Sequence, residues 1–248
     1  MTAVPHFTDK AAAERRTKSM FTISNPEEGA LALPPDFAGL PLTPFVKRNR
    51  LFSPGATIYA QEDIAPPIYR LLDGCVALTH LLSDGRRQIL DIVGPGRLFG
   101  FALGGSNHCG AQALTFSQAE SPWQKIDQSA LDQALLRMLG RAYSHVTLLG
   151  RKTAMEKVAS AVCDLAGEFK RPMRKSQRGV LTFNLYLTRA DLGDWLGLTI
   201  ETVSRCLNQL KRDRIIDFSH PEIVRILDIE TLQALAAGRY VDAGICRA

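Results

Sequence analysis

The chain has 248 residues, of which 46% are hydrophobic, and its formal net charge is +5 at pH 7. This length predicts about two domains with packed cores, and the modest positive charge permits binding to a polyanion without demonstrating it. The chain contains neither a run of about 18 apolar residues nor an apolar signal-peptide core, so we expect a cytoplasmic protein without a membrane partner. Its five cysteines form no C-x-x-C pair, which argues against a disulfide framework and a closed zinc site; we predict no metal.

The first part of the chain is expected to hold an arm and a barrel. Residues 1–40 mix alanine, charge, proline and glycine without sustained periodicity, which is typical of a loosely ordered N-terminal arm. Over residues 41–126, short runs rich in branched residues alternate with turns such as Asp73-Gly74 and Ser83-Asp84-Gly85. This regular spacing predicts an antiparallel β-barrel domain.

A helix with a coiled-coil repeat is predicted over residues 127–151. Apolar and small residues recur there at alternating four- and three-residue spacing, namely Leu131, Leu135, Met138, Ala142, His145 and Leu149. A helix with such a seam needs a partner, and if a second copy of the chain supplies it, His145 would be a buried polar residue that fixes the register of the two copies. The alternative is that the stripe packs on the barrel of its own chain.

Residues 152–248 are expected to form the C-terminal domain, which opens with a helix over residues 152–169. The segment LTRADLGDWLGLTIETVSRCLNQLK then reads as two short helices around a turn. Thr188 and Asp191 form a capping box for the first helix, and Gly197 stops it. Thr199 caps the second, whose inner side is predicted to carry Ile200, Val203, Leu207 and Leu210. Two strands flanking residues 219–222 predict the hairpin of a winged helix.

The outer side of the second helix carries the chemistry that reads bases. Arg205 can donate two hydrogen bonds to guanine, Glu201 can accept from cytosine, and Ser204 can contact either a base or a thymine methyl group. A polar face can also be plain solvated surface, but the caps and the basic Lys211, Arg212 and Arg214 favour a helix-turn-helix on DNA. The predicted DNA-binding residues are Thr199, Glu201, Thr202, Ser204, Arg205, Asn208 and Lys211.

The run from Glu201 to Arg205 matches an E-x-x-S-R motif and resembles the Fnr/FixK-like branch of the Crp/Fnr superfamily of bacterial transcription regulators. The resemblance spans about residues 45 to 235. It implies an α+β protein with an N-terminal jelly-roll sensor domain, a long dimerisation helix and a C-terminal winged helix-turn-helix domain. It also implies a homodimer that binds inverted repeats of TTGA-like half-sites and activates transcription. No nucleophile elbow, P-loop or H-E-x-x-H motif occurs, so we expect no enzyme.

The signal that controls such a regulator is less evident. The superfamily's cyclic-nucleotide branch uses a glutamate and an arginine, yet residues 94–101 offer no carboxylate and residues 108–111 no arginine. The oxygen-sensing branch holds an iron-sulfur cluster on cysteines of the N-terminal arm, whereas the first cysteine here is Cys75. We therefore expect a FixK-like regulator without a cofactor. The alternative is a heme- or other small-effector-dependent gas or redox sensor that has DNA binding as its output.

Two further predictions concern single side chains. Arg86 and Arg87 follow the turn at Ser83-Asp84-Gly85, and in Fnr-like proteins the corresponding hairpin touches RNA polymerase, which is therefore an expected partner. An ordinary solvated hairpin tip is the alternative. Cys206 follows Arg205 on the second helix and could be a redox thiol, but its spacing favours a small apolar filler beside the inner stripe.

Overall fold

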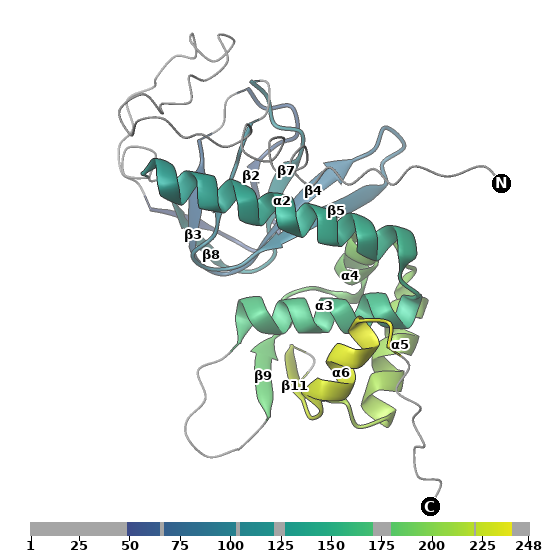
Figure 1. Ribbon diagram of the computed structural model, residues 1–248. Coiled ribbons are helices and arrows are strands. Elements are labelled where there is room, and N and C mark those ends of the chain that lie inside the picture. The colour runs from purple at the N-terminus through teal and green to yellow at the C-terminus, as the bar shows by residue number, and fades with distance from the viewer. Residues whose placement is uncertain are drawn as a thin grey trace, which may run out of the picture. The chain divides into compact units, whose positions relative to one another are not determined.

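The computed structural model describes residues 49–64, 67–102, 105–121, 127–170, 180–220 and 222–239. The arm predicted for residues 1–40 lies outside the described residues, as do both ends of the predicted barrel domain and residues 240–248. The fold is α+β, as predicted, with antiparallel sheets, a long helix and a helix-turn-helix region that has a small sheet of its own (Figure 1).

Two antiparallel sheets form the barrel domain. Their strands are β1 (Arg50–Phe52), β2 (Thr57–Tyr59), β3 (Tyr69–Asp73), β4 (Val76–Leu81), β5 (Arg87–Val93), β6 (Leu98–Phe99), β7 (Gly110–Ala113) and β8 (Ser117–Glu120). Within the described residues one sheet has the order β1-β8-β3-β6 and the other β2-β7-β4-β5. Sequence neighbours such as β2 and β3 thus lie in different sheets, which is the arrangement expected of a jelly roll.

The turn between β3 and β4 depends on a glycine. Gly74 has φ +96°, and a Cβ atom built on it would lie 2.5 Å from Ser117 Oγ and 2.6 Å from the Phe116 carbonyl oxygen. Any other residue would be both strained and crowded there. The sharp turn leads directly into the fully buried Cys75 and then into Val76 and Ala77, the first two residues of β4, which are also fully buried.

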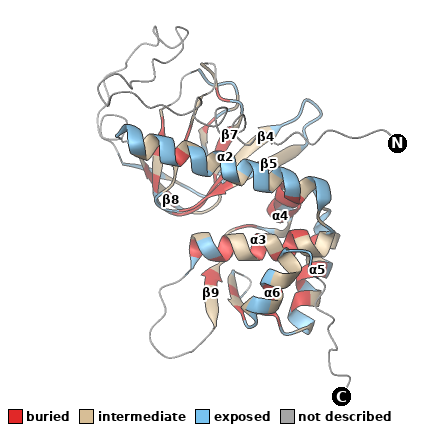
Figure 2. Ribbon diagram, in the orientation of Figure 1, coloured by how far each residue is buried: buried red, intermediate tan, exposed pale blue. Residues whose placement is uncertain are grey.

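The long helix α2 (Gln128–Arg151) follows the barrel, and α3 (Ala154–Phe169) follows α2. The Asp127 side chain caps α2 by accepting from Ala130 N–H, while Thr153 and Glu156 form a reciprocal capping box that begins α3. Helix α2 agrees with its predicted range to within a residue, whereas α3 begins two residues later than predicted because Thr153 is its N-cap. The face of α3 that contains Val158, Ala161 and Leu165 is buried (Figure 2).

The helix-turn-helix region consists of β9 (Leu181–Asn184), α4 (Arg189–Leu196), α5 (Ile200–Arg212), β10 (Ile216–His220), β11 (Ile223–Ile226) and α6 (Ile229–Ala236). Strands β10 and β11 pair antiparallel and form the predicted wing, whose turn includes Pro221, outside the described residues. Strand β9 adds a third strand beside β11, and α6 packs on α3; neither element was predicted from the sequence.

Two clusters of buried residues make up the core. One lies in the barrel and includes Tyr59, Tyr69, Leu71 and Phe99. The other begins at the buried residues of β4 and β5 and continues through α3, α4 and α5 into the small sheet. The barrel and the helix-turn-helix region therefore share apolar packing. No helix in the described part of the chain is long and apolar enough to cross a membrane.

Candidate DNA-binding interface

Helix α4 is built by local signals at both of its ends. Thr188 N–H donates to Asp191 Oδ2 at 2.9 Å, and Asp191 N–H donates back to Thr188 Oγ1 at 3.1 Å. Gly197 ends the helix in the left-handed conformation at φ 61°. Gly193 allows the turn to approach closely, because a Cβ atom there would lie 2.8 Å from the Leu198 carbonyl oxygen. These contacts fix the turn that leads into α5.

Helix α5 has one buried side and one exposed side. Val203, Leu207 and Leu210 are at most 2% exposed, as predicted for the inner stripe. Ile200 was also predicted on that side, but it is 50% exposed because it is the first residue of the helix and precedes the packed region. The buried stripe packs α5 against α3 and α4, so the two helices of the motif are held as one unit.

The outward side of α5 presents the predicted base-reading groups to solvent. Glu201, Arg205 and Asn208 are exposed, and Ser204 is half-buried. Hydrogen bonds from its own backbone N–H and from Thr199 hold the pKa of the Glu201 carboxyl below its ordinary value, so this group remains a hydrogen-bond acceptor. Thr202 Oγ1 accepts from Arg205 Nη2 at 3.2 Å, which still leaves other guanidinium donors free for a ligand.

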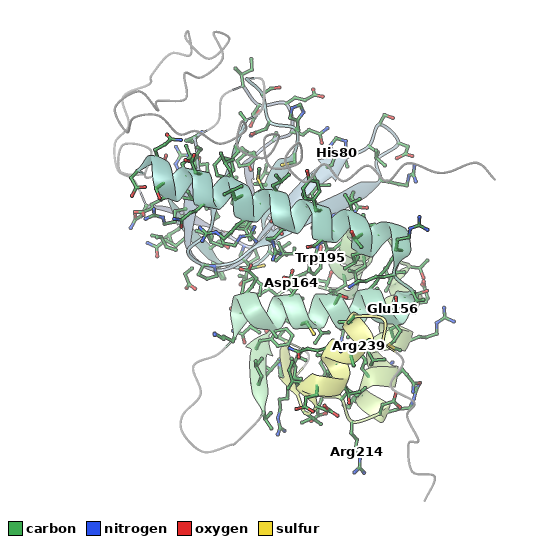
Figure 3. The ribbon with its side chains drawn as sticks, viewed as in Figure 1. His80, Glu156, Asp164, Trp195, Arg214 and Arg239 are labelled. Carbon is green, nitrogen blue, oxygen red and sulfur yellow. The ribbon has the colours of Figure 1, made fainter. Side chains whose placement is uncertain are left out.

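Basic residues lie at the C-terminal end of α5. Lys211 Nζ is 3.6 Å from Asp217 Oδ1 and Lys211 is about half exposed, so the ion pair is weak and screened by salt. Arg212 and Arg214 are exposed, and Figure 3 shows Arg214 projecting away from the domain. Arg214 has φ 56°, a left-handed conformation that the sequence did not reveal. The end of α5 therefore carries positive charge that can reach phosphates.

Cys206 lies on the buried side of α5 and is 8% exposed. Burial raises the pKa of its thiol, although the nearby charge of Arg205 acts in the opposite direction. A raised pKa lowers the fraction of reactive thiolate at neutral pH. The environment thus favours the reading of Cys206 as an apolar filler over that of a redox thiol.

Aromatic side chains fill the interior of the barrel. Tyr59, Tyr69 and Phe99 are each at most 6% exposed, and their rings stack with centroids 5.5 to 6.4 Å apart. The nearby glycine-rich turn carries Arg97, whose guanidinium bonds to Asp91 Oδ2 at 2.5 Å and to the Ile92 carbonyl at 2.6 Å. Arg97, the cationic side chain of that turn, therefore already bonds to groups of the protein itself.

The histidines that the structure describes do not form a metal site with neighbouring side chains. Across the described residues, no group of three His, Cys, Asp or Glu side chains could hold a metal ion. His145 stacks on the Trp195 ring with centroids 6.2 Å apart, and Figure 3 shows Trp195 beside α2. His145 Nε2 is buried without a hydrogen-bond partner. Burial lowers the pKa of this imidazole, which keeps it neutral near pH 7.

The exposed apolar stripe of α2 differs from the predicted seam. Five of the six predicted residues, Leu131, Leu135, Met138, His145 and Leu149, are half-buried against their own chain, and Ala142 is exposed. A second stripe is much more exposed: Leu136 at 68%, Leu139 at 45%, Tyr143 at 66% and Val146 at 68%. Its three- and four-residue spacing is also that of a coiled coil, although this stripe was not predicted from the sequence.

The two arginines of the β4–β5 hairpin point in different directions. Arg86 has a side chain that is 77% exposed and pairs locally with Asp84 at 2.8 Å. Arg87 is only 29% exposed, because it reaches α4 and bonds to Asp191 and Asp194. Only Arg86 thus projects into solvent, where a second protein could meet it.

Comparison with known proteins gives a consistent result. Residues 49–133 match the model of the cyclic nucleotide-binding domain, and residues 156–235 match the Crp-like helix-turn-helix domain. The chain is 35% identical over 188 residues to the nitrogen fixation regulation protein FixK of Rhizobium meliloti, covering 74% of this chain and 85% of that protein. It is 30% identical over 217 residues to the transcriptional activator FnrL of Cereibacter sphaeroides, covering 81% of this chain and 84% of FnrL. The solved structure of FixK2 from Bradyrhizobium japonicum aligns with a TM-score of 0.67 at 31% identity, covering 77% of this chain and 98% of that one.

Proposed function

This chain belongs to the Crp/Fnr family of DNA-binding transcription regulators, in its FixK-like branch, and from that premise we propose that it is a homodimeric activator that reads inverted repeats of TTGA-like half-sites. The observation that carries the proposal is the exposed side of α5. There Glu201, Ser204 and Arg205 lie on one face of a helix whose other face is fully packed. A helix laid in the major groove presents such side chains to base edges.

Each of these groups has a partner in a TTGA-like half-site. The guanidinium of Arg205 suits the two acceptors of guanine, and the ionised Glu201 suits the amine of a cytosine on the opposite strand. Ser204 suits a base or a thymine methyl group. Thr199, Thr202, Asn208 and Lys211 flank these readers, and we assign them contacts to the backbone or to neighbouring bases.

Binding to an inverted repeat requires two recognition helices related by a two-fold axis, so we propose a homodimer. We assign the contact to the exposed stripe of Leu136, Leu139, Tyr143 and Val146, in place of the seam expected from sequence. These side chains face water in the single chain, and their spacing lets two parallel helices interlock. A second copy of this chain is the occupant that this spacing favours.

We further propose that the protein is active as made, without cyclic nucleotide or another cofactor. The aromatic packing of Tyr59, Tyr69 and Phe99 supports this, as does the engagement of Arg97 by Asp91. The visible spectrum of freshly purified protein tests the alternative of a heme-dependent sensor. A Soret band would overturn our proposal, and a colourless protein that binds DNA would support it.

Contact with RNA polymerase is proposed for Arg86, the exposed arginine of the hairpin. Since promoter DNA is the ligand, we propose a cytoplasmic location. Selection of binding sites from a random DNA library tests the central proposal. We expect inverted TTGA-like half-sites with centres about 10 to 10.5 base pairs apart. Recovery of a direct repeat, or of no repeat, would contradict it.

A further inference from the structure

Arg87 joins the barrel to the helix-turn-helix motif. Its Nε donates to Asp194 Oδ2 at 2.8 Å, and its Nη2 donates to Asp191 Oδ1 at 2.5 Å. Its remaining nitrogen, Nη1, donates to Gln112 Oε1 on β7 at 3.1 Å. One guanidinium therefore bonds to its own sheet and to two carboxylates of α4.

Asp191 has a double task in this contact. Its Oδ2 accepts from Thr188 and completes the capping box of α4, while its Oδ1 accepts from Arg87. The carboxylate that completes the N-terminal cap of α4 is thus also the carboxylate that bonds to the barrel through Arg87. Hydrogen bonds to charged groups in half-buried surroundings are stronger than those in open water, and Asp191 has a side chain that is only 11% exposed.

A second contact lies one residue further along β5. Gln88 Nε2 donates to the Trp195 carbonyl oxygen at 3.3 Å, near the C-terminal end of α4. Strand β5 therefore holds α4 near its start through Asp191, in its middle through Asp194 and near its end through Trp195. Helix α4 is in turn packed on α5 through the tight turn at Gly197 and the shared core. The orientation of α5 follows from that of α4.

We propose that Arg87 is a positioning residue for DNA recognition, which fixes the recognition helix on the barrel so that the two helices of a dimer keep a set distance. The inference rests on the proposed function and assigns Arg87 a role in DNA binding instead of contact with polymerase. A dimer whose recognition helices are fixed on their barrels can bind both half-sites only at one spacing. If the recognition helices are free to move, binding costs additional conformational entropy at every site, but the dimer can bind half-sites at more than one spacing.

The experiment compares full-length variants on two duplexes. One holds the inverted repeat at its selected spacing, and the other has one extra base pair between the half-sites, which shifts them by about 3.4 Å and rotates them by about 34°. The variants are Arg87→Ala, Arg87→Lys and the matched control Arg86→Ala, whose arginine pairs only with Asp84 of its own turn.

We expect Arg87→Ala to bind the correct site about ten-fold more weakly, a change that corresponds to about 1.4 kcal/mol, and to discriminate less between the two spacings. Arg87→Lys should recover part of both properties, and Arg86→Ala should bind like wild type. The proposal is overturned if Arg87→Ala keeps the wild-type affinity, or if its affinity falls while its preference for spacing is unchanged, because simple loss of stability would leave that preference intact.

Asp194→Ala provides a second route should Arg87→Ala fold poorly. Asp194 does not cap α4, so its removal leaves the capping box in place. Asp194→Ala should show the same reduced discrimination between the two spacings. The double variant Arg87→Ala/Asp194→Ala should bind DNA no more weakly than Arg87→Ala alone. Fully additive losses would contradict a direct partnership. Arg205→Ala distinguishes failure of the Arg87 inference from failure of the proposed function. If the proposed function is wrong, wild type and Arg205→Ala should bind the repeat equally; if only the inference on Arg87 is wrong, Arg205→Ala should still bind more weakly than wild type.

Discussion

Val146→Glu is expected to separate the proposed dimer without unfolding the chain. Val146 is 68% exposed in the single chain, and burying a complete valine side chain contributes about 1.5 kcal/mol or more. Covering the exposed part by a partner is therefore worth about 1 kcal/mol per subunit, or about 2 kcal/mol per dimer. The variant also places two like charges in the seam without partners, at a cost of several kcal/mol. The sum of about 5 kcal/mol weakens dimerisation by more than about a thousand-fold.

Sedimentation velocity at micromolar concentration measures this effect. We expect monomers whose circular dichroism and melting temperature match those of monomeric wild type, because the side chain at position 146 lies in water before association. Ser144→Glu is the matched control, since Ser144 is exposed on the same helix but lies away from the stripe of Leu136, Leu139, Tyr143 and Val146. A stable Val146→Glu dimer would refute the assignment of this stripe.

Three further results are expected. Arg205→Ala should cost about 1 to 3 kcal/mol and relax preference at the guanine of each half-site, whereas Lys211→Ala should weaken all sequences alike and flatten the salt dependence by about one unit; titrations against matched and mutated duplexes would expose an error if both variants behaved alike. His145 has a lowered pKa because of burial, with Asp91, Arg141, Asp164 and Lys157 as the surrounding charges, so its unfolded form binds the proton more readily. Stability should therefore fall as the pH drops below about 6.5, and His145→Leu should lose that part of the dependence in urea unfolding at several pH values; identical profiles would show that another group is responsible. Gly74→Ala should destabilise the barrel by about 2 to 4 kcal/mol through strain and overlap, while Gly55→Ala, with φ +83° and no atom within 4 Å of its Cβ, should cost only about 1 kcal/mol by the same assay; equal losses would contradict the role of crowding.

The helix-turn-helix motif was readable from sequence because its signals are local. Thr188, Asp191, Gly197 and Thr199 lie within twelve residues, and each acts on the backbone next to it. The barrel was readable for a similar reason, since its turns and branched runs recur at short spacing. The wing strands followed from the same pattern, but β9 did not, because it is short and follows residues without a clear pattern.

The face of α2 that packs on its own chain could not be predicted from the sequence in the same way. The helix carries two apolar stripes with the same spacing, and only the positions of β5 and α3 decide which one the chain itself covers. Arg87 and Asp194 illustrate the limit more sharply, since they are 107 residues apart and neither belongs to a motif that predicts the other. Burial and long-range ion pairs depend on tertiary structure, and a single sequence holds no local signal for them.

Strand β5 is the element on which these long-range contacts converge. Arg141 of α2 bonds to Asp91 of β5 and to Asp164 of α3, each at 2.8 Å. Burial disfavours the charge of Arg141, but the hydrogen bonds that it donates to Asp164 and Asp91, together with the negative charge of these carboxylates, outweigh burial and raise its pKa. Half-buried ion pairs add little net stability and depend strongly on geometry, so their main effect here is to orient α2 and α3 on the strand. Since Arg87 of the same strand holds α4, a displacement of β5 would disturb α2, the proposed dimerisation helix, together with α4 and the proposed recognition helix α5. Contacts within the protein thus fix this arrangement without a bound effector, as the proposal of a regulator that is active as made requires.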